Sequence, residues 1–284
     1  MKNKIMGYIF CGSKLGGDEK AFLKIAKKKN IELVLFNLEE DFDNKKIIEK
    51  INKCDIIFNN SAEEEAFELE KTIEVFGKKV IDSPKIAYEF DDKWTFFLEC
   101  RKHGIPTINT ILLSENLKLA EKELKEFNQW PVILKRIEGT CGEYVDKAGN
   151  IKEAIKIIKK FWKKGSQRLP VIAQEYILSP CYRVLTIGDK IVQSAVKHNN
   201  GWKKTGVYEK TKSEKFKIDK DLRKIIMKII KMSKINVCGI DLLKKEKNWL
   251  VLEINTVPAL DFFPKERDKL AGMILDLLVR KIQR

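Results

Sequence analysis

The residues with the clearest chemical potential lie near the C-terminus, in the stretch "CGIDLLKKEKNWLVLEIN". Two apolar segments flank a polar turn at about residues 246–248, which indicates a β-hairpin. If the hairpin folds about Lys247, Asp241 lies opposite Glu253, because both are six positions from that centre. Residues two apart on a strand share a face, so Asn255 joins Glu253. The other face then carries Leu250, Leu252 and Ile254.

The two facing carboxylates of this hairpin, Asp241 and Glu253, suggest a cation site. Directly opposed residues in an antiparallel pair have Cβ atoms about 4.5–5.5 Å apart. Two carboxylates at that distance repel each other unless a cation lies between them or one is protonated. Oxygen ligands of this kind suit Mg²⁺, which typically binds one or two carboxylates together with substrate phosphates. The spacing also leaves open the polar outer face of an ordinary hairpin.

A glycine-containing loop follows another predicted strand in "VILKRIEGTCGEYV" (132–145). The apolar segment ends in Lys135, and Gly139 and Gly142 come after it. Backbone amides of such a loop, together with a lysine ammonium, can neutralise phosphate oxygens. Lys93 in "DDKW" supplies a second candidate cation near the start of a predicted helix. From these residues alone, a tight hairpin turn and a surface lysine remain the alternatives.

The elements that must position these residues follow two patterns. Residues 1–84 alternate short apolar segments with helical ones in the order βαβαβαβ, which favours a parallel sheet covered by helices. After Pro84, "AYEFDDKWTFFLECRKHG" predicts one helix, and a small unit of strands and helices with the glycine loop follows. The C-terminal part combines a hairpin around "GDK", a long helix at 220–234, the Asp241 hairpin and a last helix at about 267–282.

Composition bears on the compartment and the class of partner. The apolar runs are far too short for a membrane span, and the N-terminal one is too short for a signal-peptide core. Six scattered cysteines without a CxxC pair, and two distant histidines, disfavour a zinc site and fit a reducing, cytoplasmic compartment. The net charge of +15 fits an acidic partner or simply lysine-rich, solvated helix faces. Without an arginine–aromatic cluster, nucleic acid is the less favoured partner.

Taken in chain order, the motifs resemble the ATP-grasp fold, and within it the RimK-like carboxylate–amine ligases. They are Lys93, "ILK" with Lys135, "GTCGEYV", "AQEYI", "YRVL", "GIDLL" and "LEINTVP", and they cover about residues 85–284. The resemblance implies a mixed α/β and α+β chain, with an N-terminal small parallel-sheet domain before the ATP-grasp fold. The expected units are 1–84, a central subdomain with a glycine lid at 85–172, and a C-terminal subdomain with the metal site at 173–284.

The same resemblance implies a role for each matched position. Lys93 and Lys135 would hold nucleotide phosphates under a lid formed by Gly139, Thr140, Cys141 and Gly142. A hinge strand would read adenine through its backbone, at Gln174, Glu175, Tyr176 and Ile177. Arg183 would face the transferring phosphate, and Lys204 would stand near the reacting acyl phosphate. Mg²⁺, with two ions expected and Mn²⁺ as a substitute, would be bound by Asp241, Glu253 and Asn255.

The implied reaction joins an amine to a carboxylate at the expense of ATP. The substrate carboxylate attacks the γ-phosphate to give an acyl phosphate and ADP, and the amine then attacks the acyl phosphate to form an amide. The expected amine is glutamate or a similar amino acid. The expected acceptor is a small-molecule, cofactor-precursor or peptide carboxylate, for which an acidic molecule would suit the positive charge. The oligomeric state is open, with a homo-oligomer among the options.

Departures from the family pattern keep two other functions open. The lid usually reads close to G-S-x-G-x-G-V, but Tyr144 stands where a third glycine is expected. An acidic residue often stands where this chain has Cys181, and Gly206 replaces an expected asparagine. Because glycine is the freer residue, Tyr144 is expected to stiffen the lid. A nucleotide-binding module without ligase activity therefore remains possible, as does a nucleic-acid-binding protein on charge alone.

Overall fold

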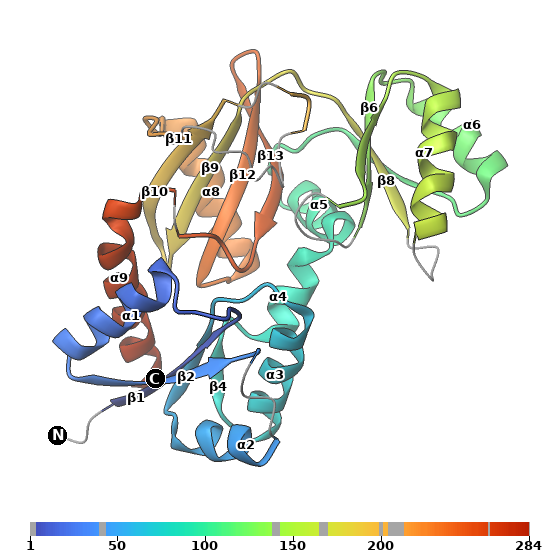
Figure 1. Ribbon diagram of the computed structural model, residues 1–284. Coiled ribbons are helices and arrows are strands. Elements are labelled where there is room, and N and C mark those ends of the chain that lie inside the picture. The colour runs from blue at the N-terminus through green and yellow to red at the C-terminus, as the bar shows by residue number, and fades with distance from the viewer. Residues whose placement is uncertain are drawn as a thin grey trace.

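The computed structural model describes residues 4–39, 44–137, 143–164, 170–198, 201–203, 213–260 and 262–283. Its strands form three separate sheets, which Figure 1 shows from one side. Within these ranges, no helix has the length and apolar character that a membrane crossing requires.

The N-terminal sheet is parallel, as the sequence predicts, with the strand order β2-β1-β3-β4. Its strands are β1 (Lys4–Phe10), β2 (Ile31–Asn37), β3 (Ile56–Asn59) and β4 (Lys79–Ile81). Its helices are α1 (Gly17–Lys28), α2 (Asn44–Lys53) and α3 (Glu64–Val75). Alternate residues of β1 are buried on opposite faces: Tyr8 packs against α1, and Ile9 lies in a cluster with residues of α2 and α3.

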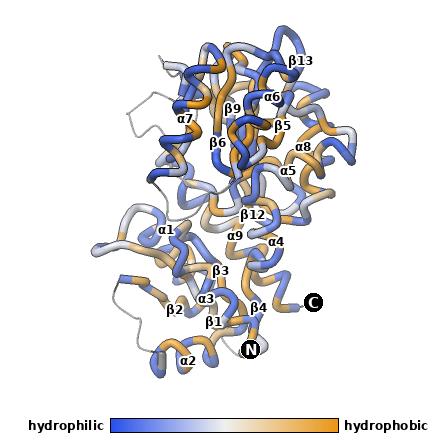
Figure 2. The backbone as a smooth tube through the Cα atoms, turned by 90° about the vertical axis from the view of Figure 1, so that its right-hand side faces the viewer, coloured by the Kyte–Doolittle hydropathy of each residue, from blue (hydrophilic) through white to orange (hydrophobic). Residues whose placement is uncertain are grey.

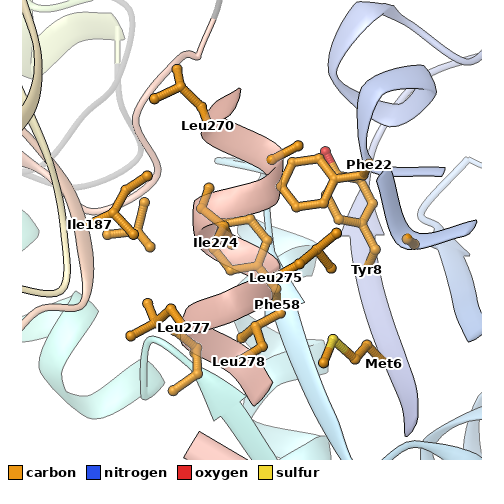
Figure 3. Close-up of a cluster of buried hydrophobic side chains, with 14 of the residues drawn as sticks. Met6, Tyr8, Phe22, Phe58, Ile187, Leu270, Ile274, Leu275, Leu277 and Leu278 are labelled. Atoms are coloured by element: carbon orange, nitrogen blue, oxygen red, sulfur yellow. The ribbon is translucent and has the colours of Figure 1, made fainter. Parts of the chain in front are cut away.

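The last helix, α9 (Arg267–Ile282), packs between this N-terminal sheet and the third sheet, because its buried residues share one cluster with Tyr8 of β1 and Ile187 of β9 (Cys181–Ile187). Figure 3 shows α9 with Tyr8 and Phe22 on one side and Ile187 on the other. Ion pairs also join α1 to α9, such as the one between Lys29 and Asp276 at 2.7 Å. The chain therefore closes on its own beginning, and the boundaries of its three expected units stay a prediction.

The central sheet is antiparallel, with the order β5-β8-β6-β7, and helices cover one of its faces. Its strands are β5 (Thr110–Leu113), β6 (Val132–Arg136), β7 (Val145–Ala148) and β8 (Val171–Glu175). Its helices are α6 (Leu117–Phe127) and α7 (Ile151–Lys164). On β6, Val132 and Leu134 pack under the helices, whereas Ile133 and Lys135 line a pocket on the other face.

The third sheet is antiparallel and has the order β11-β10-β9-β12-β13. It comprises β9 (Cys181–Ile187), β10 (Lys190–Lys197), β11 (Ser213–Glu214), β12 (Val237–Lys245) and β13 (Asn248–Asn255). The predicted hairpin around "GDK" is confirmed as the β9–β10 pair. Helix α8 (Lys220–Ser233) packs on this sheet, and the short helix η1 (Pro264–Glu266) precedes α9.

The single helix predicted after Pro84 is wrong, because the structure has two helices there, α4 (Pro84–Asp91) and α5 (Lys93–Lys102). Asp92 separates them with an extended backbone, and its side chain accepts a hydrogen bond from the backbone N–H of Thr95 at 2.6 Å. Asp92 is therefore the N-cap of α5. The break places Lys93 in the first turn of the new helix.

Candidate active site

The cross-strand pair predicted for the C-terminal hairpin is confirmed: Asp241 on β12 lies opposite Glu253 on β13. The predicted centre of the hairpin turn is wrong. Lys245 pairs with Asn248, so the turn contains only two residues rather than being centred on Lys247. A bulge after Asp241 leaves Leu252 as one extra residue on β13, and this extra residue restores the Asp241–Glu253 pair.

The bulge also changes which residues of β13 share a face. Ile254 packs in the core under α8, as expected for a buried residue. Leu250 and Leu252 do not join it, because they pack beside Ile177 of the pocket. The single apolar face predicted for these three residues is therefore wrong. Leu252 lines the pocket while the next residue, Glu253, approaches Lys135, so the pocket continues into a charged region.

Asp241 is the most buried carboxylate of the site, with 1% of its surface exposed. It pairs across the sheet with Arg183 of β9, which donates hydrogen bonds from Nε and Nη2 at 2.6 and 2.5 Å. Asn255 donates a longer one from Nδ2 at 3.4 Å. Burial works against the charge of Arg183, but the negative charge of Asp241 outweighs it and raises the pKa of the guanidinium.

The two predicted phosphate-binding lysines lie close enough to interact with each other, and Lys135 also approaches Glu253. Lys135 is buried, and its Nζ lies 3.8 Å from Oε2 of Glu253. Burial lowers the pKa of Lys135, Glu253 opposes that effect, and the positive charge of Lys93 adds to it. Lys93 is held at the start of α5, where its Nζ donates to the carbonyl of Ile137 at 3.5 Å.

The predicted hinge residues line an apolar pocket between the central and C-terminal sheets. The pocket walls include Ile108, Ile133, Lys135, Gln174, Glu175, Tyr176, Ile177, Leu243 and Leu252. Gln174 donates to Thr110 Oγ1 at 3.0 Å, but its own Oε1 is buried without a hydrogen-bond partner among the described residues. A buried acceptor of this kind would be satisfied by a ligand that carries N–H donors.

The structure brings together Lys93, Lys135, the four hinge residues, Arg183, Asp241, Glu253 and Asn255. The other predicted positions are Gly139, Thr140, Cys141, Gly142 and Lys204, which lie outside the described residues. Of the lid, Tyr144 is described, and its φ of +50° lies in the left-handed region that glycine favours. Its ring stacks under Arg136, with 3.7 Å from Cζ to the ring centroid.

Several residues at the site were not predicted from the sequence. Thr256 donates to both carboxylate oxygens of Asp91 at 3.0 Å, and burial is the main cause that raises the pKa of Asp91 to about 6. Phe262 lies beside Arg183 and Lys197, 5.4 and 4.5 Å from ring centroid to Cζ and Nζ. The paired acids of "DDKW" and the aromatic pair of "ALDFF" were the available signals. Trp202, an aromatic residue in a lysine-rich segment, also lines the pocket.

The donor set fits a hard cation. Asp241 and Glu253 supply carboxylate oxygens and Asn255 an amide oxygen, which are ligands that Mg²⁺ prefers. The described residues contain no cluster of three or more His, Cys, Asp or Glu side chains that could hold a metal. Two carboxylates and an amide match the use of Mg²⁺ with substrate phosphates completing the shell, rather than an all-protein cage.

Comparison with solved structures identifies the class of protein to which this fold belongs. The structure is similar to the RimK domain ATP-grasp protein from Sphaerobacter thermophilus, with a TM-score of 0.77 and 16% identity over 96% of this chain and 98% of that chain. The fold is therefore that of the ATP-grasp ligases. Residues 90–278 match the RimK-like ATP-grasp domain family, and the chain belongs to this family.

Curated relatives are similar at the sequence level. The chain is 26% identical to a probable alpha-L-glutamate ligase from Haemophilus influenzae over 204 residues, which cover 71% of this chain and 67% of the relative. It is 26% identical to a coenzyme gamma-F420-2:alpha-L-glutamate ligase from Methanocaldococcus jannaschii over 193 residues, 66% of this chain and 65% of the relative. The matches span between about half and two thirds of the length of such relatives.

Proposed function

We propose that the protein is an ATP- and Mg²⁺-dependent ligase that joins the amine of an amino acid to a carboxylate through an acyl phosphate. The observation that carries this proposal is the position of Lys135. Its side chain lines the apolar pocket and also lies 3.8 Å from Glu253, so one residue connects the pocket with the carboxylates. A nucleotide with its base in the pocket would direct its phosphates toward a lysine and the candidate metal ligands.

The apolar walls and the unpaired Oε1 of Gln174 suit a purine base with an exocyclic amine. Lys93 and Lys135 would neutralise the phosphate oxygens, assisted by the backbone of the lid at 139–142. Asp241, Glu253 and Asn255 would hold Mg²⁺, for which two ions are expected with Mn²⁺ as a substitute. Bound there, the metal would supply charge neutralisation between the phosphates.

Arg183 would stabilise the charge that develops on the transferred phosphoryl group, because its guanidinium is fixed by Asp241. Lys204 would serve the acyl phosphate from the lysine-rich loop. The carboxylate substrate would bond to the γ-phosphorus as the bond to ADP breaks, and the amine would then displace phosphate from the acyl carbon. The work of these residues is positioning and charge neutralisation, so no protein nucleophile is needed.

The relatives favour L-glutamate as the amine substrate, because two of them are named alpha-L-glutamate ligases. The acceptor would be a small-molecule, cofactor-precursor or peptide carboxylate. The net charge of +15 supports an acidic acceptor over a neutral one. A homo-oligomer is compatible with this function and is not required by it.

The test is ADP release with ATP, Mg²⁺ and every pairing of an amino-acid panel with a carboxylate panel, with the product identified by mass. A ligase forms ADP and an amide with at least one pair, and Asp241→Asn abolishes both while Asp221→Asn, an exposed change on α8, does not. If ATP binds in calorimetry and no pair raises ADP above background, the protein is a nucleotide-binding module. Salt-sensitive binding to nucleic acid without nucleotide turnover would instead indicate a nucleic-acid-binding protein.

A further inference from the structure

Helix α7 carries a stripe of lysines on its outer surface. The stripe consists of Lys152, Lys156, Lys159 and Lys163, all exposed. Their spacings of four, three and four residues place them on one side of the helix. Figure 2 shows the alternation of hydrophilic and hydrophobic residues along α7. With Lys160, the stripe lines a groove whose other walls are Glu115, Asn116, Leu117, Ile155 and Trp162.

The positive charge of this stripe is not balanced within the described part of the chain. Lys160 forms an ion pair with Asp146 at 3.2 Å, but the four stripe lysines have no acidic partner there. The single acid of α7, Glu153, is bound to the backbone N–H of Gly149 and the side chain of Asn150. Like charges three and four residues apart on a helix repel each other, so the stripe is electrostatically unfavourable by itself.

The other lysine-rich helices differ from α7 in the pairing or in the surroundings of their lysines. On α6, Lys125 pairs with Glu121 at 2.7 Å and Lys122 with Glu126 at 3.8 Å. Helix α8 has four exposed lysines at similar helical spacing, and among the described residues only Lys224 of the four pairs with an acid, Asp221. The α7 stripe differs from the lysines of α8 in that its members line this groove.

The groove lies outside the candidate active site. The inner face of α7 packs against Val132 and Leu134 of β6, whereas the pocket lies on the opposite face of that strand, beside Ile133 and Lys135. Figure 1 shows α6 and α7 on the side of the central sheet that faces away from β12 and β13. A molecule bound along α7 would therefore leave the pocket accessible.

We propose that the α7 groove binds an acidic segment of a polypeptide partner in an extended conformation. With a rise of about 1.5 Å per residue, the stripe spans roughly 16 Å, which an extended chain covers with about five or six residues. Same-side residues of an extended chain recur about every 6.6 Å, close to the spacing of about 4.5–6 Å between stripe lysines. Apolar walls at Leu117 and Ile155 suit a polypeptide.

The inference does not rest on the proposed ligase activity, and its test uses binding alone. A fluorescein-labelled peptide with six consecutive glutamates between neutral Gly-Ser flanks is titrated with the full-length protein without ATP, and anisotropy is measured at physiological salt. The quadruple variant K152Q/K156Q/K159Q/K163Q should bind at least about tenfold more weakly, since four exposed ion pairs are lost. The matched variant K220Q/K224Q/K228Q/K231Q removes the same charge from α8 and should change affinity less than about twofold.

Three results would overturn the proposal. The first is no binding of the peptide to the unaltered protein. The second is an equal loss of peptide affinity in both quadruple variants, which would show that the net charge alone determines binding. The third is a single-stranded oligonucleotide of equal charge that binds more tightly than the peptide and loses that binding only in the α7 variant. The far-UV circular dichroism spectrum should be unaltered in both variants, and this control verifies that each is folded.

Discussion

Arg183 and Asp241 lie opposite each other on β9 and β12, joined by two hydrogen bonds of 2.6 and 2.5 Å. The Asp241 side chain is almost fully buried, and the Arg183 side chain is 14% exposed. This pair fixes the candidate metal ligand and the candidate phosphate-facing cation relative to each other. In the proposed reaction, Mg²⁺ and Arg183 would therefore share one carboxylate.

Removing the guanidinium of Arg183 should show that the buried carboxylate of Asp241 depends on a neighbouring cation. Arg183→Gln leaves Asp241 buried and unpaired, so we expect a loss of about 3 kcal/mol in unfolding free energy without Mg²⁺. Saturating Mg²⁺ with ATP should restore more thermal stability to this variant than to the unaltered protein. Differential scanning calorimetry measures both effects. The exposed change Arg223→Gln on α8 is the control, and equal Tm values for the two variants would show that the pair does not hold Asp241.

Tyr144 occupies a backbone conformation that favours glycine, with φ of +50°. Its ring is held by Arg136 and by an edge contact with Phe161, 5.8 Å between centroids. Tyr144→Gly would remove about 1 kcal/mol of backbone strain and also the ring contacts that tether the end of the lid. We expect faster proteolysis within the lid and a changed ATP affinity, while Tyr144→Phe should retain both values. Unchanged proteolysis and affinity in the glycine variant would make Tyr144 a bystander.

Glu70 on α3 gives a prediction for pH. Burial raises its pKa to about 8, and the polar side chain of Asn59 opposes the shift. Between pH 4.5 and 8 the folded protein holds a proton that the unfolded chain has lost, so the unfolding free energy falls as pH rises. Glu70→Gln should remove this fall in unfolding free energy, which amounts to up to a few kcal/mol. The variant should therefore be more stable than the unaltered protein at pH 8 but not at pH 4.5. Parallel urea titrations across this range measure it, and identical slopes for both proteins would contradict it.

The hydrogen bonds from Thr256 to Asp91 tie the end of β13 to the start of the Lys93 helix. Thr256→Val removes the donor and leaves a buried carboxylate with fewer partners, at a cost of about 1–3 kcal/mol. Because Asn255 and Lys93 are both adjacent to this contact, the KM for ATP should rise several-fold, whereas kcat should change less. Steady-state ADP release separates the two constants. Thr72→Val on α3, which loses only a bond to the carbonyl of Glu68, should leave both unchanged.

Local patterns were sufficient to predict much of the fold and part of the site. The alternating segments of residues 1–84 indicated the parallel sheet, since each strand is a short apolar run between helical segments. The Asp241–Glu253 pair was predicted correctly because a two-residue turn and a bulge at Leu252 cancel in the register. The bulge itself has no local signal, and for that reason the faces of Leu250 and Leu252 were assigned wrongly.

Contacts between distant parts of the chain were not predictable from local pattern. The Thr256–Asp91 bond joins residues 165 positions apart, and α9 packs on a sheet formed at the other end of the chain. Each depends on tertiary packing, which a periodicity of two or 3.6 residues does not encode. The role of Asp92 as an N-cap was visible in "DDKW" only once the break between α4 and α5 was known.

The fate of the carboxylate oxygen tests the central claim most directly. The accepting carboxylate is labelled with ¹⁸O, and the phosphate released with Mg²⁺, ATP and the amino acid is examined by mass spectrometry. Formation of an acyl phosphate predicts one ¹⁸O atom per released phosphate, in amounts equal to the ADP and the amide formed. Release of ADP with phosphate that carries no ¹⁸O would contradict the account, because the γ-phosphate would then have been transferred to water.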